Sequence, residues 1–472
     1  MTAKARTQRH GRRRVPAPPP DGPLVGTEVE LDVGPAAHGG HCVARHEGRV
    51  VFVRHALPGE RVTAVVTEDR AGSFCRADAI AVHTPSPDRA VPPCPYAGPG
   101  RCGGCDWQHA TPAAQRRIKA GIVREQLTRL GGLGGPELDA LGLTASAEAE
   151  ELPGGMFGWR TRVQFAVDPA GTAGLRRHRS HDVVPIARCL IASDAITEIG
   201  VTDLPWPGAA TVEAVASSAG DRAVVVSPAG TPIPALDPGV AVLADNRPVR
   251  GHARVRERVG ERTYLVHAGG FWQVHPAAPA VLGEAVLAAL GPRPGDRVLD
   301  LYAGAGLFAG ALADAVPGAI PAADEVPDAG AVAEGGAVAE GGAIAEGGAV
   351  AGALSIAAVE SGRTATADAA RNLRDDPVRI VTGRVEDVLA RGGLAADLVV
   401  LDPPRAGAGA AVVTAIAALA PRAIAYVACD PAALARDVAT FASLGYRLAG
   451  LRILDAFPNT QHVECVATLA PG

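Results

Sequence analysis

From about Ala277 onward, short apolar runs alternate with helix-like segments. This alternating pattern limits the possible folds more than any other feature of the sequence. The apolar runs that read as strands are "RVLDLY", "LSIAAVE", "VRIVTG", "DLVVLD", "AIAYVAC" and "VECVATL", and "AAPAVLGEAVLAAL" reads as a helix. Strands that alternate with helices are typical of βαβ units. The sequence therefore predicts an α/β domain with a mostly parallel sheet.

Two strand ends in this region carry signs of a nucleotide-like ligand. The run "RVLDLYAGAGLFA" places Asp300 at a strand and Gly304 and Gly306 in the loop before a helix, where a backbone without side chains lets a ligand approach. The pattern fits both NAD and S-adenosylmethionine. Glu360 ends the next strand and is placed to accept hydrogen bonds from ribose hydroxyls. It lies 54 residues after Gly306, where about 20 is usual, and removing an insertion described below restores roughly normal spacing.

Three later strand ends carry groups suited to catalysis. Asp402 begins "DPPRAGAG", whose prolines would stiffen a floor beneath a planar substrate. Cys429, in "YVACDP", stands just before a helix, whose dipole favours the thiolate that a nucleophile needs. Glu464, in "HVECVATL", offers a carboxylate as a base, with His462 close by.

The whole sequence divides into regions that differ in composition and in expected secondary structure. We expect a disordered basic tail (1–24), a small antiparallel OB-like barrel (25–85), a central β-rich domain (86–272) and the α/β domain (273–472). Within the last, the stretch 319–352 is predicted to be a low-complexity surface insertion, because it contains the six-residue repeat "AVAEGG".

Three cysteines, Cys94, Cys102 and Cys105, lie together on one Pro- and Gly-rich loop. The chain shows neither a signal peptide nor an apolar run long enough to span a membrane, so we expect a cytoplasmic protein without a membrane partner. In that compartment disulfides are rare, and a tight cysteine cluster is more often metal-binding or catalytic. The net charge of −5 argues against a uniformly basic nucleic-acid-binding coat.

Taken together, these motifs resemble those of the RNA uracil-5-methyltransferase family, bacterial enzymes that make 5-methyluridine in ribosomal or transfer RNA. The matching motifs follow the family order: "ALPGE", "CGGC", "WRTRVQF", "SHDVVPIARC", "FWQVH", "LDLYAGAGLF", "LDPPRAG", "YVACDP" and "HVE". The resemblance implies a C-terminal Rossmann-like class I methyltransferase domain, an N-terminal TRAM barrel that binds RNA, and a central β-rich domain with an iron–sulfur cluster.

The resemblance also implies the site residues. Four cysteines would ligate a [4Fe–4S] cluster with a structural role, although zinc also accepts four thiolates; these are Cys94, Cys102, Cys105 and Cys189. The positions that match the family's S-adenosylmethionine contacts are Gln273, Tyr302, Glu360 and Asp402. Cys429 would add to C6 of the uracil, and Glu464 would remove the C5 proton.

The expected partner is an RNA loop, because the target base must leave its stack to reach the thiol. Ribosomal RNA is favoured over transfer RNA, and a monomer is expected. Several arginines could hold phosphates: Arg160, Arg162, Arg176, Arg177 and Arg179.

Other functions leave some of these residues unexplained. An NAD enzyme would leave Cys429 and Glu464 without a purpose, and a DNA cytosine-5-methyltransferase would carry its cysteine in the loop that here reads "DPPRAG". Two alternatives stay open, namely a transfer-RNA enzyme and a non-catalytic RNA-binding assembly factor with a methyltransferase-like fold.

Overall fold

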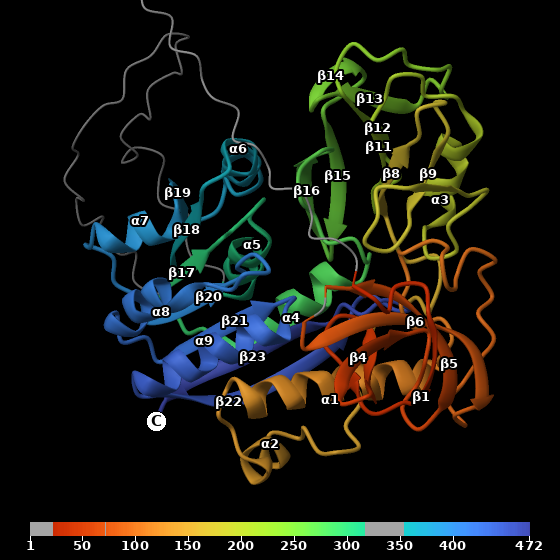
Figure 1. The fold of residues 1–472 in the computed structure, drawn as a ribbon. Helices are drawn as coiled ribbons and strands as arrows, with labels where there is room; N and C mark the ends of the chain where they lie inside the picture. The colour runs from red at the N-terminus through yellow and green to blue at the C-terminus, as the bar shows by residue number, and fades with distance from the viewer. Residues whose placement is uncertain (1–21, 71, 317–353) are drawn as a thin grey trace, which may run out of the picture. The chain divides into compact units, whose positions relative to one another are not determined.

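The computed structural model describes residues 22–70, 72–316 and 354–472 (Figure 1). The expected basic tail, except for its last three residues, and the insertion at 319–352 lie outside the described residues. The chain divides into two compact units, each described here by itself. One contains residues 22–35 and 41–87, and the other contains residues 36–40 and 88–472. A boundary near residue 272 remains a prediction, because both of its sides fall in the second unit.

The first unit is built on a twisted sheet whose strands follow the order β1-β5-β6-β4-β3. Its pairs are antiparallel except β4 with β6. In β1, Val29 and Leu31 are buried while Glu28 and Glu30 face solvent, so the alternation in "TEVELDV" sets which face is the core. The strands are β1 (Glu28–Asp32), β3 (His41–His46), β4 (Arg49–Arg54), β5 (Arg61–Asp69) and β6 (Phe74–Thr84).

The second unit begins with the cysteine loop and the helix α1 (Pro112–Arg129). The Thr111 side chain accepts a hydrogen bond from the Ala114 amide, and Pro112 opens the first turn, as predicted for this helix. A seven-stranded sheet follows in the order β10-β9-β8-β11-β12-β13-β14. Its strands are β8 (Arg162–Val167), β9 (Ala173–Arg176), β10 (Val183–Pro185), β11 (Thr211–Ala216), β12 (Arg222–Ser227), β13 (Val240–Ala244) and β14 (Arg247–Arg250).

A hairpin, β15 (Arg254–Val259) and β16 (Arg262–His267), leads into the α/β part, whose sheet has the order β19-β18-β17-β20-β21-β23-β22-β7. The strands from β19 to β21 are parallel, and β23 runs antiparallel to β21. The strands are β17 (Arg297–Leu301), β18 (Ser355–Glu360), β19 (Val378–Thr382), β20 (Leu398–Leu401), β21 (Ala423–Ala428), β22 (Tyr446–Asp455), β23 (Glu464–Pro471) and the short β7 (Glu150–Glu151). The strand order reverses direction between β17 and β20, where ligands of open α/β sheets bind.

Helices cover both faces of this sheet, in agreement with the α/β prediction (Figure 1). One core cluster packs α1, α7, α8 and α9 against the sheet, and another packs α4, α5 and α6. The helices are α4 (Ala278–Leu290), α5 (Leu307–Ala315), α6 (Arg363–Asn372), α7 (Val385–Ala390), α8 (Gly409–Ala418) and α9 (Pro431–Ser443). Among the described residues, none of the helices combines the length and apolar character needed to cross a bilayer.

A buried ion pair joins α1 to the sheet. Lys119 Nζ lies 2.5 Å from Asp455 Oδ1 at the end of β22 and also donates to the carbonyl oxygen of Phe457. Both charged side chains are almost fully buried, so neither can regain water if its partner is removed.

We expect Asp455→Ala to lower the free energy of unfolding by about 3–5 kcal/mol, because it leaves the Lys119 ammonium buried and unpaired. The double variant Lys119→Met, Asp455→Leu should be far less destabilised, since it removes both charges. Urea unfolding measures both values, and equal losses in the single and double variants would contradict the expectation.

Candidate active site

The strand ends singled out in the sequence meet at one edge of the α/β sheet. Residues 301, 359 and 401 lie in register on the adjacent parallel strands β17, β18 and β20. Tyr302, Glu360 and Asp402 each follow one of these residues directly, so the three side chains leave the sheet at the same edge. Tyr302 has φ of 65°, a left-handed conformation that a bulky residue seldom adopts and that occurs most often at functional sites.

Glu360 organises the loop that follows β17. Its Oε2 accepts a hydrogen bond from the Gly304 amide at 3.0 Å, and its Oε1 accepts one from the Gly362 amide at 2.6 Å. Asp300 is fully buried and accepts from the Ala309 amide in α5. These carboxylates fix the glycine loop and the start of α5 around the space above the sheet.

Cys429 and Glu464 come together through the antiparallel pairing of β21 with β23. Ala428 pairs with Cys465. Because the strands are antiparallel, Cys429, which follows Ala428, and Glu464, which precedes Cys465, both stand at the end of the same ladder. Cys465 is fully buried in the core. Cys429 is half-buried, whereas Glu464 is 4% exposed.

The electrostatics of this edge are governed by two acids, the half-buried Asp402 and the buried Glu464. Burial raises the pKa of Asp402 to about 7. Burial and the nearby Asp402 carboxylate raise the pKa of Glu464 well above its usual value. Both acids therefore hold protons much more readily than they would in water, which suits a proton acceptor that works near neutral pH.

The expectation of a stabilised Cys429 thiolate is wrong for the resting protein. Burial, followed by the Glu464 and Asp402 carboxylates, raises the pKa of the Cys429 thiol to about 11, and the Arg405 cation only partly opposes them. Although Cys429 immediately precedes α9, its environment favours the neutral thiol.

A cavity of about 190 Å³ opens beside Cys429. Typical small-molecule pockets measure about 300–1,000 Å³, so this one suits a single planar base. In its wall, Arg405 Nη2 lies 3.5 Å from His462 Nε2, and burial together with Arg405 lowers the pKa of His462 to about 4. The lining residues are His38, Gly39, Arg405, Cys429, Asp430, Pro431, Gln461, His462 and Val463.

The loop that carries Asp402 and Arg405 is held by a residue that the sequence analysis missed. Asp437 in α9 is buried and accepts hydrogen bonds from the Tyr426 hydroxyl at 2.7 Å and the Ala408 amide at 2.8 Å. Gly407 passes so close that an added Cβ would lie 2.8 Å from Asp437 Oδ2. An acid in the middle of a helix gives no sequence signal of this role.

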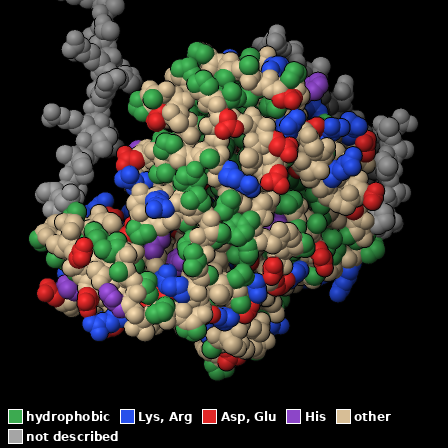
Figure 2. All heavy atoms as spheres, turned by 90° about the vertical axis from the view of Figure 1, so that its right-hand side faces the viewer, with side chains coloured by type: hydrophobic (Ala, Val, Ile, Leu, Met, Phe, Trp, Pro, Cys, Tyr) green, Lys and Arg blue, Asp and Glu red, His purple; other side chains and the backbone are tan. Residues whose placement is uncertain are grey.

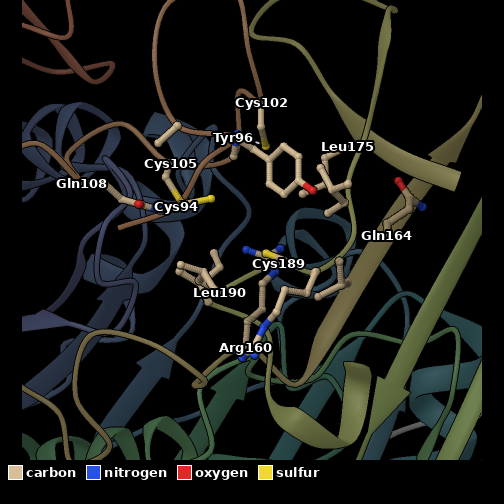
Figure 3. A pocket seen from close by; sticks show the side chains of 16 residues that line it. Cys94, Tyr96, Cys102, Cys105, Gln108, Arg160, Gln164, Leu175, Cys189 and Leu190 are labelled. Carbon is tan, nitrogen blue, oxygen red and sulfur yellow. Dashed lines mark hydrogen bonds between the residues drawn. The ribbon is translucent and has the colours of Figure 1, made fainter. Parts of the chain in front are cut away.

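The four cysteines expected to bind a metal line a second cavity, of about 310 Å³. Figure 3 shows their side chains directed toward this cavity, together with Arg160. None of the eight cysteines, all of which lie in the part of the chain that the structure describes, forms a disulfide. In the part of the chain that the structure describes, no three His, Cys, Asp or Glu side chains approach closely enough to hold one metal ion.

Gln273 lines neither of the two cavities. It is on the segment between β16 and α4 and is 8% exposed, two residues after the exposed Phe271.

The arginines predicted to hold phosphates have different environments. Arg162 is buried, donates to the carbonyl oxygens of Ala268 and Gly270, and lies 3.6 Å from Glu257, so its predicted RNA contact is wrong. Arg177 is exposed and pairs with Asp182, and Arg176 and Arg179 are also exposed. On the face drawn in Figure 2, basic and acidic side chains are interspersed.

Comparison with known proteins identifies the family. Residues 23–80 match the TRAM domain family, and residues 383–471 match the family described as tRNA (Uracil-5-)-methyltransferase. An uncharacterized RNA methyltransferase of Streptomyces coelicolor is 52% identical over 95% of this chain and 94% of its own length. The 23S rRNA (uracil(1939)-C(5))-methyltransferase RlmD of Alkalilimnicola ehrlichii is 31% identical over 97% of both chains.

The chain belongs to the RNA uracil-5-methyltransferase family. It is an S-adenosylmethionine-dependent enzyme that methylates C5 of uridine in RNA. The crystal structure of the Pyrococcus abyssi tRNA (uracil-54, C5)-methyltransferase, in complex with S-adenosyl-L-homocysteine, has the same fold. It is 21% identical, with a TM-score of 0.63, over 93% of this chain and 99% of its own.

We expect alkylation of Cys429 by iodoacetamide to accelerate about tenfold per pH unit between pH 8 and 10 without a plateau, because only the thiolate reacts and the thiol pKa is raised. Arg405→Ala should slow the reaction at each pH, since it removes the cation that favours the thiolate. Mass spectrometry of the peptide that contains Cys429 measures both rates, and a plateau below pH 9 would contradict the raised pKa.

Proposed function

We propose that this enzyme methylates a uridine of 23S ribosomal RNA through a covalent bond between Cys429 and C6 of the uracil. The observation that carries the proposal is the position of a half-buried thiol in a base-sized cavity, at the end of the ladder that also brings in the buried Glu464. A structural cysteine would need neither the cavity nor a proton acceptor.

The chemistry follows from the weak nucleophilicity of C5. Once the Cys429 thiol has released its proton to solvent, addition of the thiolate to C6 makes C5 an enolate carbon, which takes the methyl group. S-adenosylmethionine, when bound, supplies that methyl group as a sulfonium electrophile and leaves as S-adenosylhomocysteine. The Glu464 carboxylate then removes the C5 proton, and the electron pair of that bond expels the Cys429 sulfur from C6.

Residues of the strand-end edge would hold the methyl donor. Glu360 already orders the glycine loop, and its carboxylate suits the ribose hydroxyls. Tyr302 and Asp402 share its edge of the sheet. Gln273 is assigned to the same set through its match to the family motif.

We propose that Cys94, Cys102, Cys105 and Cys189 hold a [4Fe–4S] cluster. A single Zn²⁺ would need its four thiolates about 2.3 Å from one point, whereas these side chains face a cavity of about 310 Å³. In a cluster each thiolate binds its own iron, which suits a wider spacing. Arg160 lines the same cavity, and its charge would offset that of the thiolates.

Ribosomal RNA is supported by the relative from Alkalilimnicola ehrlichii, which resembles this chain over nearly its whole length. Transfer RNA is supported by the description of the family matched at 383–471. We favour 23S rRNA because the TRAM domain and the cysteine set occur together with whole-length similarity to a 23S rRNA enzyme. We place the enzyme in the cytoplasm as a monomer.

We expect the purified enzyme to transfer a labelled methyl group to 23S rRNA and not to bulk tRNA, forming 5-methyluridine. Cys429→Ala should lower transfer at least about a thousandfold, since the covalent route is lost. Mass spectrometry of RNA digests measures both. Labelled tRNA would select the transfer-RNA alternative, and a fully active Cys429→Ala variant would refute the mechanism.

We expect Glu464→Gln to accumulate a covalent protein–RNA adduct, because methylation proceeds while proton removal fails. Wild-type activity should fall as the pH drops through the raised pKa of Glu464, since the base must be deprotonated. Denaturing gels detect the adduct, and turnover at the wild-type rate would exclude Glu464 as the base.

For the cysteine site, protein purified without air should contain about four iron and four sulfide per chain. Cys189→Ser should lower both, because one of the four ligands is lost. Elemental analysis decides, and one zinc per chain without sulfide would contradict the cluster.

A further inference from the structure

The two cavities are joined by hydrogen bonds through residues next to Cys105. The amides of Asp106 and Trp107 both donate to the carbonyl oxygen of Asn459, at 2.9 and 3.0 Å. In return, the Gln461 amide donates to Asp106 Oδ2 at 2.9 Å. Asp106 is only 6% exposed, so water does not compete freely for these bonds.

The residues held in this way belong to the loop 456–463, which connects β22 to β23. Gln461, His462 and Val463 line the cavity beside Cys429, and Glu464 comes next. We call this segment the catalytic loop. Its position therefore determines both the wall of the base-sized cavity and the approach to the proposed base.

A buried amide pair reinforces the same loop. Gln115 of α1 accepts from the Asn459 amide at 2.8 Å and donates to Asn459 Oδ1 at 3.2 Å and to the Trp107 carbonyl oxygen at 3.0 Å. Asn459 has φ of 69°, a left-handed conformation that persists only where such contacts over-determine it.

On its other side, the cysteine loop is tied to the central sheet. The Gly103 amide donates to the carbonyl oxygen of Arg176 in β9 at 2.9 Å, and the Ala187 amide donates to the Tyr96 hydroxyl at 2.8 Å. The segment from Cys94 to Trp107 thus bridges the catalytic loop and the seven-stranded sheet, whose strand β10 is followed by the loop that carries Cys189.

We propose that Asp106 is a positioning residue that transmits the order of the cysteine loop to the catalytic loop. When the four cysteines hold their metal group, Asp106 is fixed and keeps Gln461 in place beside Cys429. When the cysteine loop loses that order, the wall of the base-sized cavity loosens. The methyltransferase site therefore responds to whether the four cysteines hold their metal group, although these cysteines take no part in the reaction. This proposal rests on the proposed roles of Cys429 and of the cysteine cavity.

The test is hydrogen–deuterium exchange of the full chain, purified without air. In Asp106→Ala, amides of the catalytic loop should exchange about tenfold faster, because a buried hydrogen bond is lost. Asp106→Asn should stay near wild type, since its side-chain oxygen still accepts from Gln461.

The matched control is Asp368→Ala, which removes another buried acid. Asp368 accepts from the His267 amide at 2.8 Å and pairs with Arg254. This variant should leave the exchange of the catalytic loop unchanged. Wild-type exchange in Asp106→Ala, or equal acceleration in Asp368→Ala, would overturn the proposal.

Removing the metal group gives a second, independent measurement. Wild-type protein treated with ferricyanide and EDTA should also exchange about tenfold faster in the catalytic loop. The same treatment of Asp106→Ala should add little, because the connection is already broken. Stripped wild-type protein with an unchanged catalytic loop, or equal added effects in both proteins, would overturn the proposal even if Asp106→Ala folded poorly.

A functional readout separates this proposal from the proposed mechanism. Asp106→Ala should form the covalent adduct with 5-fluorouridine RNA about tenfold more slowly while binding S-adenosylmethionine as wild type does. Exchange is measured without RNA, so a Cys429→Ala variant that still methylates would refute the nucleophile and leave the exchange result standing. An unchanged catalytic loop would refute the coupling whatever the activity.

Discussion

The antiparallel pairing of β23 with β21 is the constraint on which the active site depends. Parallel strands alone would deliver Tyr302, Glu360, Asp402 and Cys429 to one edge, but each would come from a strand that runs the same way. The reversed strand begins at that edge and so brings Glu464 to the end of the ladder beside Cys429. A one-residue slip would turn Glu464 away and present Cys465 instead.

What holds the start of β23 in that register is a set of buried polar contacts outside the sheet. Gln115 and Asp106 bind the loop before β23, and Lys119 binds the end of β22. Each group is buried, so each lost contact leaves a polar atom that water cannot reach. The helix α1 and the cysteine loop therefore belong to the support of the active site, although they lie hundreds of residues away in sequence.

The sequence predicted the structure correctly where a local residue pattern determines it. Strand-end motifs predicted the edge that holds Glu360, Asp402 and Cys429, and the Thr111 cap predicted the start of α1. The strand β22 and the contacts of Asp106 and Asp437 were missed, because their partners are distant in sequence and leave no periodic signal. Arg162 was misjudged for a related reason: charge suggests exposure, but the side chain is buried, where Nη1 donates to two carbonyl oxygens and Nη2 lies 3.6 Å from Glu257.

The misjudged ionisation of Cys429 shows how the site controls its own reactivity. A helix N-terminus favours a thiolate, yet the acids gathered at the same edge oppose it, and burial strengthens their repulsion. Ionising Asp402, Glu464 and Cys429 together would place three negative charges close to one another, which costs free energy. With Arg405 as the nearby cation in this balance, the edge favours a positively charged ligand, whose arrival would ease ionisation of the base and the nucleophile alike. A thiol kept neutral until then is protected from oxidation and stray alkylation, which a permanently ionised cysteine would not be.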